Sequence, residues 1–191
     1  MRSHHPPSLF LLISLPLFFS FFTLQPTTSS ATLIRDTCRQ CSKTDPNLDY
    51  EFCTNSLESS PYSRRYSSDL HQLGLLSFNL TRHNVTSTRN FIKHLLKNNK
   101  EKKLDPYVKA CLNDCLELYT EALRSIKDAE KDYKAKEYDD ANIALSSVND
   151  ASTTCEDGFN EKEKVVSPLT KRNRYTFQLT VISLSIMNML T

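Results

Sequence analysis

Residues 108–133 read VKACLNDCLELYTEALRSIKDAEKDY. Apolar and cysteine side chains recur in this stretch at intervals of three or four residues, and that spacing keeps them on one face of an α-helix. The positions that share the face are Val108, Cys111, Cys115, Leu118, Ala122, Ile126, Ala129 and Tyr133. The spacing predicts a long amphipathic helix with one buried face.

The next stretch of the chain has the same spacing. Its inward positions are Tyr138, Ala141, Leu145, Val148, Ser152, Cys155 and Phe159. Only Lys134 to Glu137 separates the two stretches, and a connection this short makes the two helices antiparallel neighbours. We therefore expect a hairpin of two long helices at the centre of the fold.

Residues that interrupt helices are scarce elsewhere, which predicts further long helices. One is expected from about Ser63 to Lys97. Its inward side chains are predicted to be Leu70, Leu73, Leu80, Phe91 and Leu95. The last helix is expected after Pro168. Its buried face is predicted to carry Leu179, Ile182, Ile186 and Met189.

These helices predict an all-α fold, a four-helix up-and-down bundle over residues 62–191 that is stapled by disulfides. Residues 32–61 are expected to form an N-terminal helical hairpin, from Leu33 to about Ser60, that turns at Thr44 to Asn47. The apolar end of the last helix is not expected to be a membrane tail, because polar side chains interrupt it. These are Gln178, Ser183, Ser185 and Asn188.

Residues 1–31 have the order of a secretory signal peptide: Arg2, then an apolar run from Leu9 to Leu24, then small residues up to Ala31. Pro16 interrupts the run, which is also short for a membrane span, so a signal anchor is the less favoured alternative. Cleavage near Ala31 would leave a chain with nearly balanced charge. Such a balance does not indicate a nucleic-acid partner.

The two predicted hairpins also predict disulfide pairs. Cys115 lies about 20 residues before the centre of the central turn and Cys155 about 20 residues after it, so the two should lie opposite each other. In the N-terminal hairpin, Cys38 and Cys53 are equally distant from the turn. We therefore pair Cys38 with Cys53 and Cys115 with Cys155.

Cys41 and Cys111 remain after this pairing. They could bond to each other, and buried free thiols are the interpretation that we favour. The alternative is a zinc site or redox pair that uses Cys38-x-x-Cys41 and Cys111-x-x-x-Cys115. The export signal and the symmetry of the hairpins both favour bridges, so no metal or cofactor is predicted.

No arrangement typical of catalysis stands out in the sequence. The three histidines after residue 31 are His71, His83 and His94, which fall on one predicted helix, away from its inward stripe and without ligand spacing. We interpret them as surface side chains. The adjacent acids Asp139 and Asp140 lie in the first turn of a helix, where the helix dipole favours negative charge.

Two N-glycosylation sequons occur, at Asn79-Leu80-Thr81 and Asn84-Val85-Thr86. At 100° per residue, Asn79 lies about 180° round the helix from the inward Leu70 and should face solvent, whereas Asn84 shares the buried stripe. A glycan is therefore predicted at Asn79, and the occupancy of Asn84 is left open.

Motifs spread over the chain after residue 31 match one family, in the same order. They include Thr37-Cys38, Asp45-Pro46-Asn47, Tyr50-Glu51-Phe52-Cys53, Leu112-Asn113-Asp114-Cys115 and Thr154-Cys155-Glu156-Asp157-Gly158-Phe159. With these motifs the chain resembles plant invertase and pectin methylesterase inhibitor domains. Within that family it is most similar to the plane-tree pollen allergens that are described as invertase inhibitors.

The resemblance implies a four-helix bundle after a helical hairpin, the same two disulfides, and action by binding another protein. Family invertase inhibitors carry a Pro-Lys-Phe element at the central turn, inserted toward the substrate cleft of the enzyme. The matching residues here are Lys136, Glu137 and Tyr138, so the aromatic is kept, the proline is absent and glutamate replaces lysine.

These three residues and Asp139 form the predicted target-binding site, with Tyr138 as its anchor. The alternative is that Tyr138 only begins the buried stripe of its helix.

The predicted function is a secreted, monomeric inhibitor of a plant acid invertase (β-fructofuranosidase), acting in the cell wall or vacuole, with no enzyme activity and no membrane partner. The first alternative is a pectin methylesterase (pectinesterase) inhibitor of the same fold. The second is an allergen-type bundle without inhibitory activity that binds a small hydrophobic ligand. An apolar cavity inside the bundle would favour that second alternative.

Overall fold

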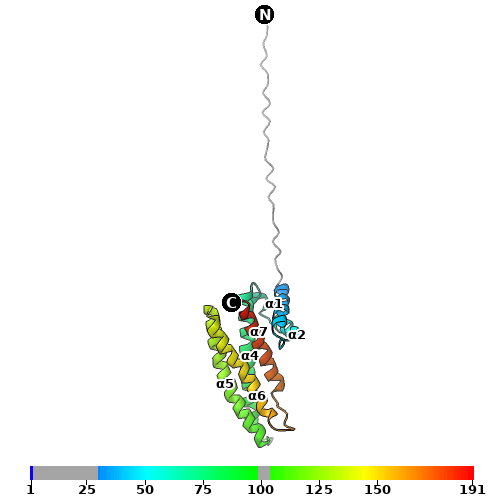
Figure 1. Ribbon diagram of the computed structural model, residues 1–191, viewed down its shortest axis with the longest axis vertical. Helices are drawn as coiled ribbons and strands as arrows, with labels where there is room; N and C mark the ends of the chain where they lie inside the picture. Colours follow the sequence, from blue (N-terminus) through cyan, green and yellow to red (C-terminus); the bar gives the residue numbers. More distant parts are fainter. Residues whose placement is uncertain (2–29, 99–103) are drawn as a thin grey trace.

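The computed structural model describes Met1, residues 30–98 and residues 104–191 (Figure 1). Most of the predicted signal segment therefore lies outside the described residues. Every regular element of the described part is a helix. The helices are α1 (Ser30–Thr44), α2 (Tyr50–Glu58), α3 (Ser63–Tyr66), α4 (Leu70–Lys97), α5 (Pro106–Ala135), α6 (Tyr138–Asn160) and α7 (Thr170–Asn188).

Helices α4, α5, α6 and α7 form an up-and-down bundle, in which each helix packs on the next and α7 returns to α4 (Figure 1). Helices α1 and α2 form a hairpin that packs on α7 and α4. The all-α bundle preceded by a helical hairpin is thus confirmed. None of the described helices is long and apolar enough to cross a membrane.

Aspartates begin three of the helices by accepting hydrogen bonds from backbone N–H groups that the first turn leaves without a partner. Asp49 accepts from Phe52 at 2.9 Å, and Asp105 accepts from Tyr107 at 2.9 Å. Asp69 accepts from Gln72 at 2.8 Å, so that α4 begins at Leu70. The prediction of one helix from Ser63 to Lys97 is therefore wrong.

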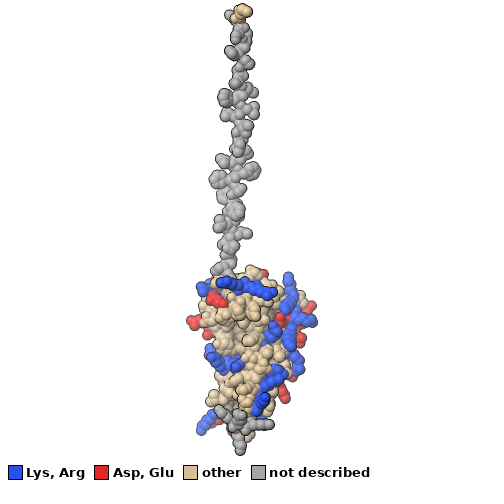
Figure 2. Space-filling model, turned by 180° about the vertical axis from the view of Figure 1, so that it is seen from behind, with Lys and Arg blue, Asp and Glu red and all other residues tan. Residues whose placement is uncertain are grey.

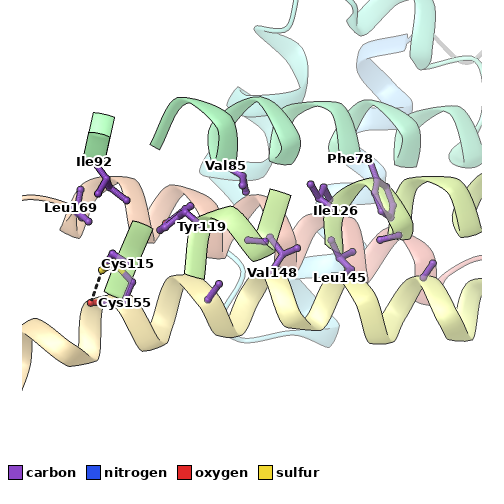
Figure 3. Packing of buried hydrophobic residues seen from close by; sticks show 14 of the residues in the cluster. Phe78, Val85, Ile92, Cys115, Tyr119, Ile126, Leu145, Val148, Cys155 and Leu169 are labelled. Carbon is purple, nitrogen blue, oxygen red and sulfur yellow. Dashed lines mark hydrogen bonds between the residues drawn. A yellow bond between two sulfur atoms is a disulfide. The ribbon is translucent and has the colours of Figure 1, made fainter. Parts of the chain in front are cut away.

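The seam between α5 and α6 is the centre of the larger hydrophobic cluster, where the two facing stripes interdigitate with α4 (Figure 3). Both predicted stripes are confirmed at most positions. Val108, Leu118 and Tyr138 are only half-buried, and beside Leu118 it is Tyr119 that is fully buried. Either residue satisfies the spacing between Cys115 and Ala122, so the period alone could not choose between them.

Helix α4 buries a broader face than the sequence predicted, because it packs on α5, α7 and the hairpin. Leu73 is buried as expected, whereas the other four predicted inward side chains are only half-buried. The centre of the face is made of Leu76, Phe78, Val85 and Ile92.

Helix α7 is buried on most of its circumference, since it contacts α1, α2, α4 and α6. Its buried hydroxyl groups bond back to the carbonyl groups of the preceding turn, as Thr180 does to Thr176 at 2.8 Å. Gln178 links α7 to the hairpin by accepting from Asp49 N–H at 3.0 Å and donating to the Asn47 carbonyl at 2.6 Å. Met189, predicted to be buried, lies beyond the last helical residue and is 40% exposed.

The structure joins Cys38 to Cys53 and Cys115 to Cys155, with Cα–Cα distances of 5.7 and 5.0 Å, which confirms both predicted pairs. Cys41 and Cys111 are buried free thiols, as favoured from the sequence. Burial raises the pKa of the Cys41 thiol to about 11, so the thiol stays protonated at the pH of any plant compartment.

At Gly74, the Tyr133 side chain of α5 lies directly against the backbone of α4. A Cβ atom at this position would lie 1.9 Å from Tyr133 Oη and 2.6 Å from Tyr133 Cζ. The ring of Tyr133 therefore occupies the space that any side chain at position 74 would need. Gly158 offers the contrast, because a Cβ atom there would meet nothing within 4 Å.

The two glycines should respond in opposite ways to substitution by alanine. Gly158→Ala should raise the free energy of unfolding by about 0.5–1 kcal/mol, because alanine favours a helix interior. Gly74→Ala should lower it by at least about 2 kcal/mol, because the methyl group forces α4 and α5 apart. Urea unfolding of both variants measures the two effects. A Gly74→Ala protein as stable as the parent would contradict the close approach.

Candidate functional site

The four residues predicted to bind a target, Lys136 to Asp139, lie at the turn between α5 and α6. This turn is at the end of the bundle where α7 also finishes (Figure 1). Asn142 of α6 donates to Asn188 Oδ1 at 3.3 Å, which places the turn beside the last residues of α7. The structure thus brings the predicted residues together at one end of the bundle.

The backbone of the turn is held by hydrogen bonds of the Schellman type. Glu137 N–H donates to the Asp132 carbonyl at 2.9 Å, and Lys136 N–H donates to the Tyr133 carbonyl at 3.1 Å. Lys136 has φ 63° and ψ 22°, the left-handed conformation that glycine usually supplies at this position. The turn is consequently ordered by its backbone and does not depend on its side chains.

This geometry explains why proline is absent from the turn. Proline fixes φ near −65° and has no N–H. Position 136 needs a positive φ and an N–H donor, so the proline implied by the resemblance could not be held here without rebuilding the turn. Residues 136–139, the tip of the α5–α6 hairpin, therefore have a backbone that proline at position 136 could not adopt.

Three of the four side chains are free to contact a partner. Lys136, Glu137 and Asp139 are exposed, and the described residues provide no ion pair for any of them. Tyr138 is half-buried, with its ring edge against Tyr133 at a centroid distance of 5.5 Å and an interplanar angle of 61°. Tyr138 thus belongs to the core on one side and to the surface of the tip on the other.

Tyr133 supports Tyr138 from below and is itself fully buried. Its hydroxyl donates to the His71 carbonyl at 3.0 Å, and its ring stacks on the His71 imidazole at 4.8 Å. Burial raises the pKa of Tyr133, which keeps the hydroxyl a donor. Tyr138 therefore packs on a rigid aromatic stack of Tyr133 and His71, and the three rings join α4, α5 and α6.

His71 corrects the prediction that all three histidines are surface side chains. His83 and His94 are exposed, but His71 is half-buried under Tyr133, and its Nε2 has no hydrogen-bond partner among the described residues. Its position on the helix gave no sign of this contact, because the ring that covers it comes from α5. Long aromatic side chains of a neighbouring helix can bury a residue that lies off the inward stripe.

A basic shoulder lies beside the tip, on the α4–α5 side. Arg82, Lys127, Lys131 and Lys134 line an open hollow of about 500 Å³ together with one carboxylate, Glu130. Glu130 pairs with Arg82 at 3.3 Å and with Lys134 at 2.6 Å. Figure 2 shows lysine and arginine side chains gathered along one edge of the bundle. The shoulder retains an excess of positive charge that an acidic surface could meet.

On the other side of the tip, a larger open hollow of about 730 Å³ is lined by amide and hydroxyl side chains together with Asp45, Leu184 and Met189. The amide and hydroxyl side chains are those of Gln40, Thr44, Asn142, Ser185 and Asn188. Both hollows beside the tip are open to solvent.

The carboxylates near the α6–α7 contact have a structural role. Glu156 accepts from Thr170 Oγ1 at 2.5 Å and from Asn173 Nδ2 at 2.6 Å, which ties α6 to the start of α7. Within the described ranges, no group of three or more histidine, cysteine, aspartate or glutamate side chains is placed to hold a metal ion.

The two sequon asparagines are both half-exposed on α4 but differ in surroundings. Asn84 Oδ1 accepts from Thr88 at 3.1 Å and from Thr176 of α7 at 3.2 Å. Asn79 lines an open groove on the far side of α4 from this contact.

Comparison with known proteins gives the same assignment throughout. Residues 32–186 match the family described as plant invertase/pectin methylesterase inhibitor. The chain is 41% identical to a protein of Platanus acerifolia named "Putative invertase inhibitor" over 173 residues, 91% of this chain and 93% of that protein. It is 33% identical to pectinesterase inhibitor 12 of Arabidopsis thaliana over 179 residues, 94% of this chain and 98% of that protein.

A crystal structure of a mutant form of an Arabidopsis pectin methylesterase inhibitor has the same fold. It superposes with a TM-score of 0.66 at 21% identity and covers 84% of this chain and 97% of its own.

Substitutions at Lys136 test the geometry of the turn. Lys136→Pro should lower the free energy of unfolding by roughly 2–3 kcal/mol, because proline removes the N–H and cannot adopt φ 63°. Lys136→Gly should raise it by about 0.5–1 kcal/mol, because the left-handed conformation no longer strains a side chain. Thermal unfolding of both variants gives the order. If the proline variant matched the parent, the turn would have another shape.

Proposed function

The chain belongs to the plant invertase/pectin methylesterase inhibitor family, and from that premise we propose that it binds an acid invertase and blocks access to its substrate cleft. Proteins of this family inhibit enzymes and are not enzymes themselves. We choose invertase because of sequence identity: the chain is 41% identical to the plane-tree relative and 33% identical to the pectinesterase inhibitor.

The α5–α6 tip is the proposed contact surface. Its backbone is fixed by the turn hydrogen bonds, so little conformational entropy is lost when it enters a cleft. Tyr138 supplies a large amphipathic surface with few torsions, which is why tyrosine is frequent among interface hot spots. Lys136, Glu137 and Asp139 surround it with exposed charge, suited to hydrogen bonds and ion pairs at the rim.

Pectin methylesterase is the second candidate target. Two departures from the Pro-Lys-Phe element favour it. Glu137 occupies the position where the resemblance implies lysine, and Lys136, in a left-handed conformation, occupies the position where it implies proline. Since two unrelated enzymes are inhibited by one fold, such differences at the tip are where target choice would be expressed.

We further propose that the chain is secreted to the cell wall or vacuole and acts as a monomer. The predicted signal peptide and the two disulfides support export, because disulfides persist in oxidising compartments. Within residues 30–98 and 104–191, the large exposed apolar side chains are scattered over the surface segments, which supports a monomer. They are Tyr62, Ile143, Val166, Tyr175 and Met189.

Titration of the purified chain against an acid invertase and a pectin methylesterase, side by side, tests the target. The proposed function requires loss of invertase activity that saturates at one inhibitor per enzyme, with the esterase unaffected at the same concentrations. Inhibition of the esterase alone would select the second target. Full activity of both enzymes would contradict an inhibitory role.

Tyr138→Ala tests the anchor. Loss of the ring contact with Tyr133 should lower the free energy of unfolding by about 1–2 kcal/mol. Inhibition, measured where the variant is fully folded, should weaken by more than about tenfold, or roughly 1.4 kcal/mol.

Tyr107→Ala is a matched control at the opposite end of α5. Tyr107 is also half-buried, and its hydroxyl donates to the Gly158 carbonyl at 2.7 Å, so its removal should cost a similar stability. Inhibition by the control should stay at the parent level. Should Tyr138→Ala inhibit as well as Tyr107→Ala does, the binding surface lies away from the tip.

A further inference from the structure

A groove of about 510 Å³ runs between the segment before α3 and the outer face of α4. One wall carries Tyr62, a large aromatic residue that is 53% exposed. The opposite wall is polar and comes from α4, with Asn79, Arg82, His83 and Thr86. An exposed aromatic face opposite hydrogen-bonding side chains is an arrangement that can hold the apolar face and the hydroxyl groups of a sugar.

Arg82 brings a positive charge to this groove. Its Nε is buried beside Glu130 at 3.3 Å, while the side chain as a whole is 41% exposed. The exposed part of a guanidinium group can donate hydrogen bonds to sugar hydroxyl groups.

Asn79 opens the sequon Asn79-Leu80-Thr81 and lines the same groove. Its side-chain amide makes no hydrogen bond to the described residues and is half-exposed. Thr81, by contrast, is fully buried, and its hydroxyl donates to the Ser77 carbonyl at 2.9 Å. An enzyme that reads the threonine must therefore act before α4 is packed, while the chain is being exported.

Asn84, in the second sequon, is placed differently. Its Oδ1 accepts from Thr176 of α7, so its amide lies at the contact between α4 and α7. A glycan on that amide would begin beside the contact between α4 and α7. The structure thus favours the first sequon over the second.

We propose that Asn79 carries an N-linked glycan whose innermost sugars lie in this groove, against Tyr62 and Arg82. The proposal rests on the proposed export of the chain. Asn79 Nδ2 would bond to C1 of the sugar as the C1–oxygen bond to a lipid diphosphate donor breaks, and the amide proton leaves with the diphosphate. The groove then acts as a binding site, or seat, for the innermost sugars and orders them along α4.

The test uses the full chain secreted by a eukaryotic host and recovered from the medium. Peptide mapping by mass spectrometry should find a glycan at Asn79 and a bare Asn84. Asn79→Gln should remove the added mass, and Asn84→Gln should leave it unchanged. A chain in the medium with Asn79 bare, or with Asn84 alone modified, would overturn the proposal. A chain that never reaches the medium would instead contradict the proposed export, and the proposal with it.

The seat itself is tested by the rate at which an N-glycan-cleaving endoglycosidase releases the glycan from the native protein. Tyr62→Ser should raise this rate about threefold to tenfold, the range expected when one aromatic contact is lost, whereas Tyr62→Phe should match the parent. An exposed reference glycan can be built at Asn98 in an Asn79→Gln, Lys100→Thr chain, and it should be released faster than the parent glycan. Equal rates for Tyr62→Ser and the parent would show that the glycan does not occupy the groove.

Discussion

The disulfide between Cys115 and Cys155 is the constraint on which the rest of the bundle depends. It joins α5 to α6 about 20 residues from their turn on either side, so the seam between the two helices is closed covalently at one end and by the turn at the other. A disulfide of this kind stabilises the folded protein chiefly by reducing the number of conformations open to the unfolded chain. With both ends fixed, the register of the seam is fixed, and with it the position of Tyr138 at the tip.

Helix α7 depends on that hairpin through buried polar contacts. The Tyr119 hydroxyl on α5 donates to Asn173 Oδ1 at 2.7 Å, while Asn173 Nδ2 donates to Glu156 of α6 at 2.6 Å. Burial raises the pKa of Tyr119, so the hydroxyl remains a donor. Buried polar groups must be paired, so this network admits one position of α7 against the hairpin. Gln178 of α7 is paired with the backbone of Asn47 and Asp49, so it positions α7 against the N-terminal hairpin in the same way.

Features set by local spacing could be predicted from the sequence, and features set by a distant side chain could not. The α5–α6 hairpin and the Cys115–Cys155 bridge followed from a short connection between two periodic stretches, and the Cys38–Cys53 bridge from equal distances to the N-terminal turn. The burial of Tyr119 in place of Leu118 depends on Asn173, which lies 54 residues away. His71 is covered by the Tyr133 ring from α5. The break before α4 depends on whether Asp69 caps the first turn of that helix. At the site, the residues of the tip could be named, but the left-handed Lys136 that shapes it could not.

A preformed tip, with its backbone held by the turn hydrogen bonds and Tyr138 packed on Tyr133, is the central claim about how this chain acts. The structure of the chain bound to the enzyme that it inhibits tests this claim most directly. Our account requires the turn to enter the substrate cleft with Tyr138 buried against the enzyme and Lys136 still left-handed. A complex in which the enzyme covers another face of the bundle, and the α5–α6 turn stays in solvent, would contradict it.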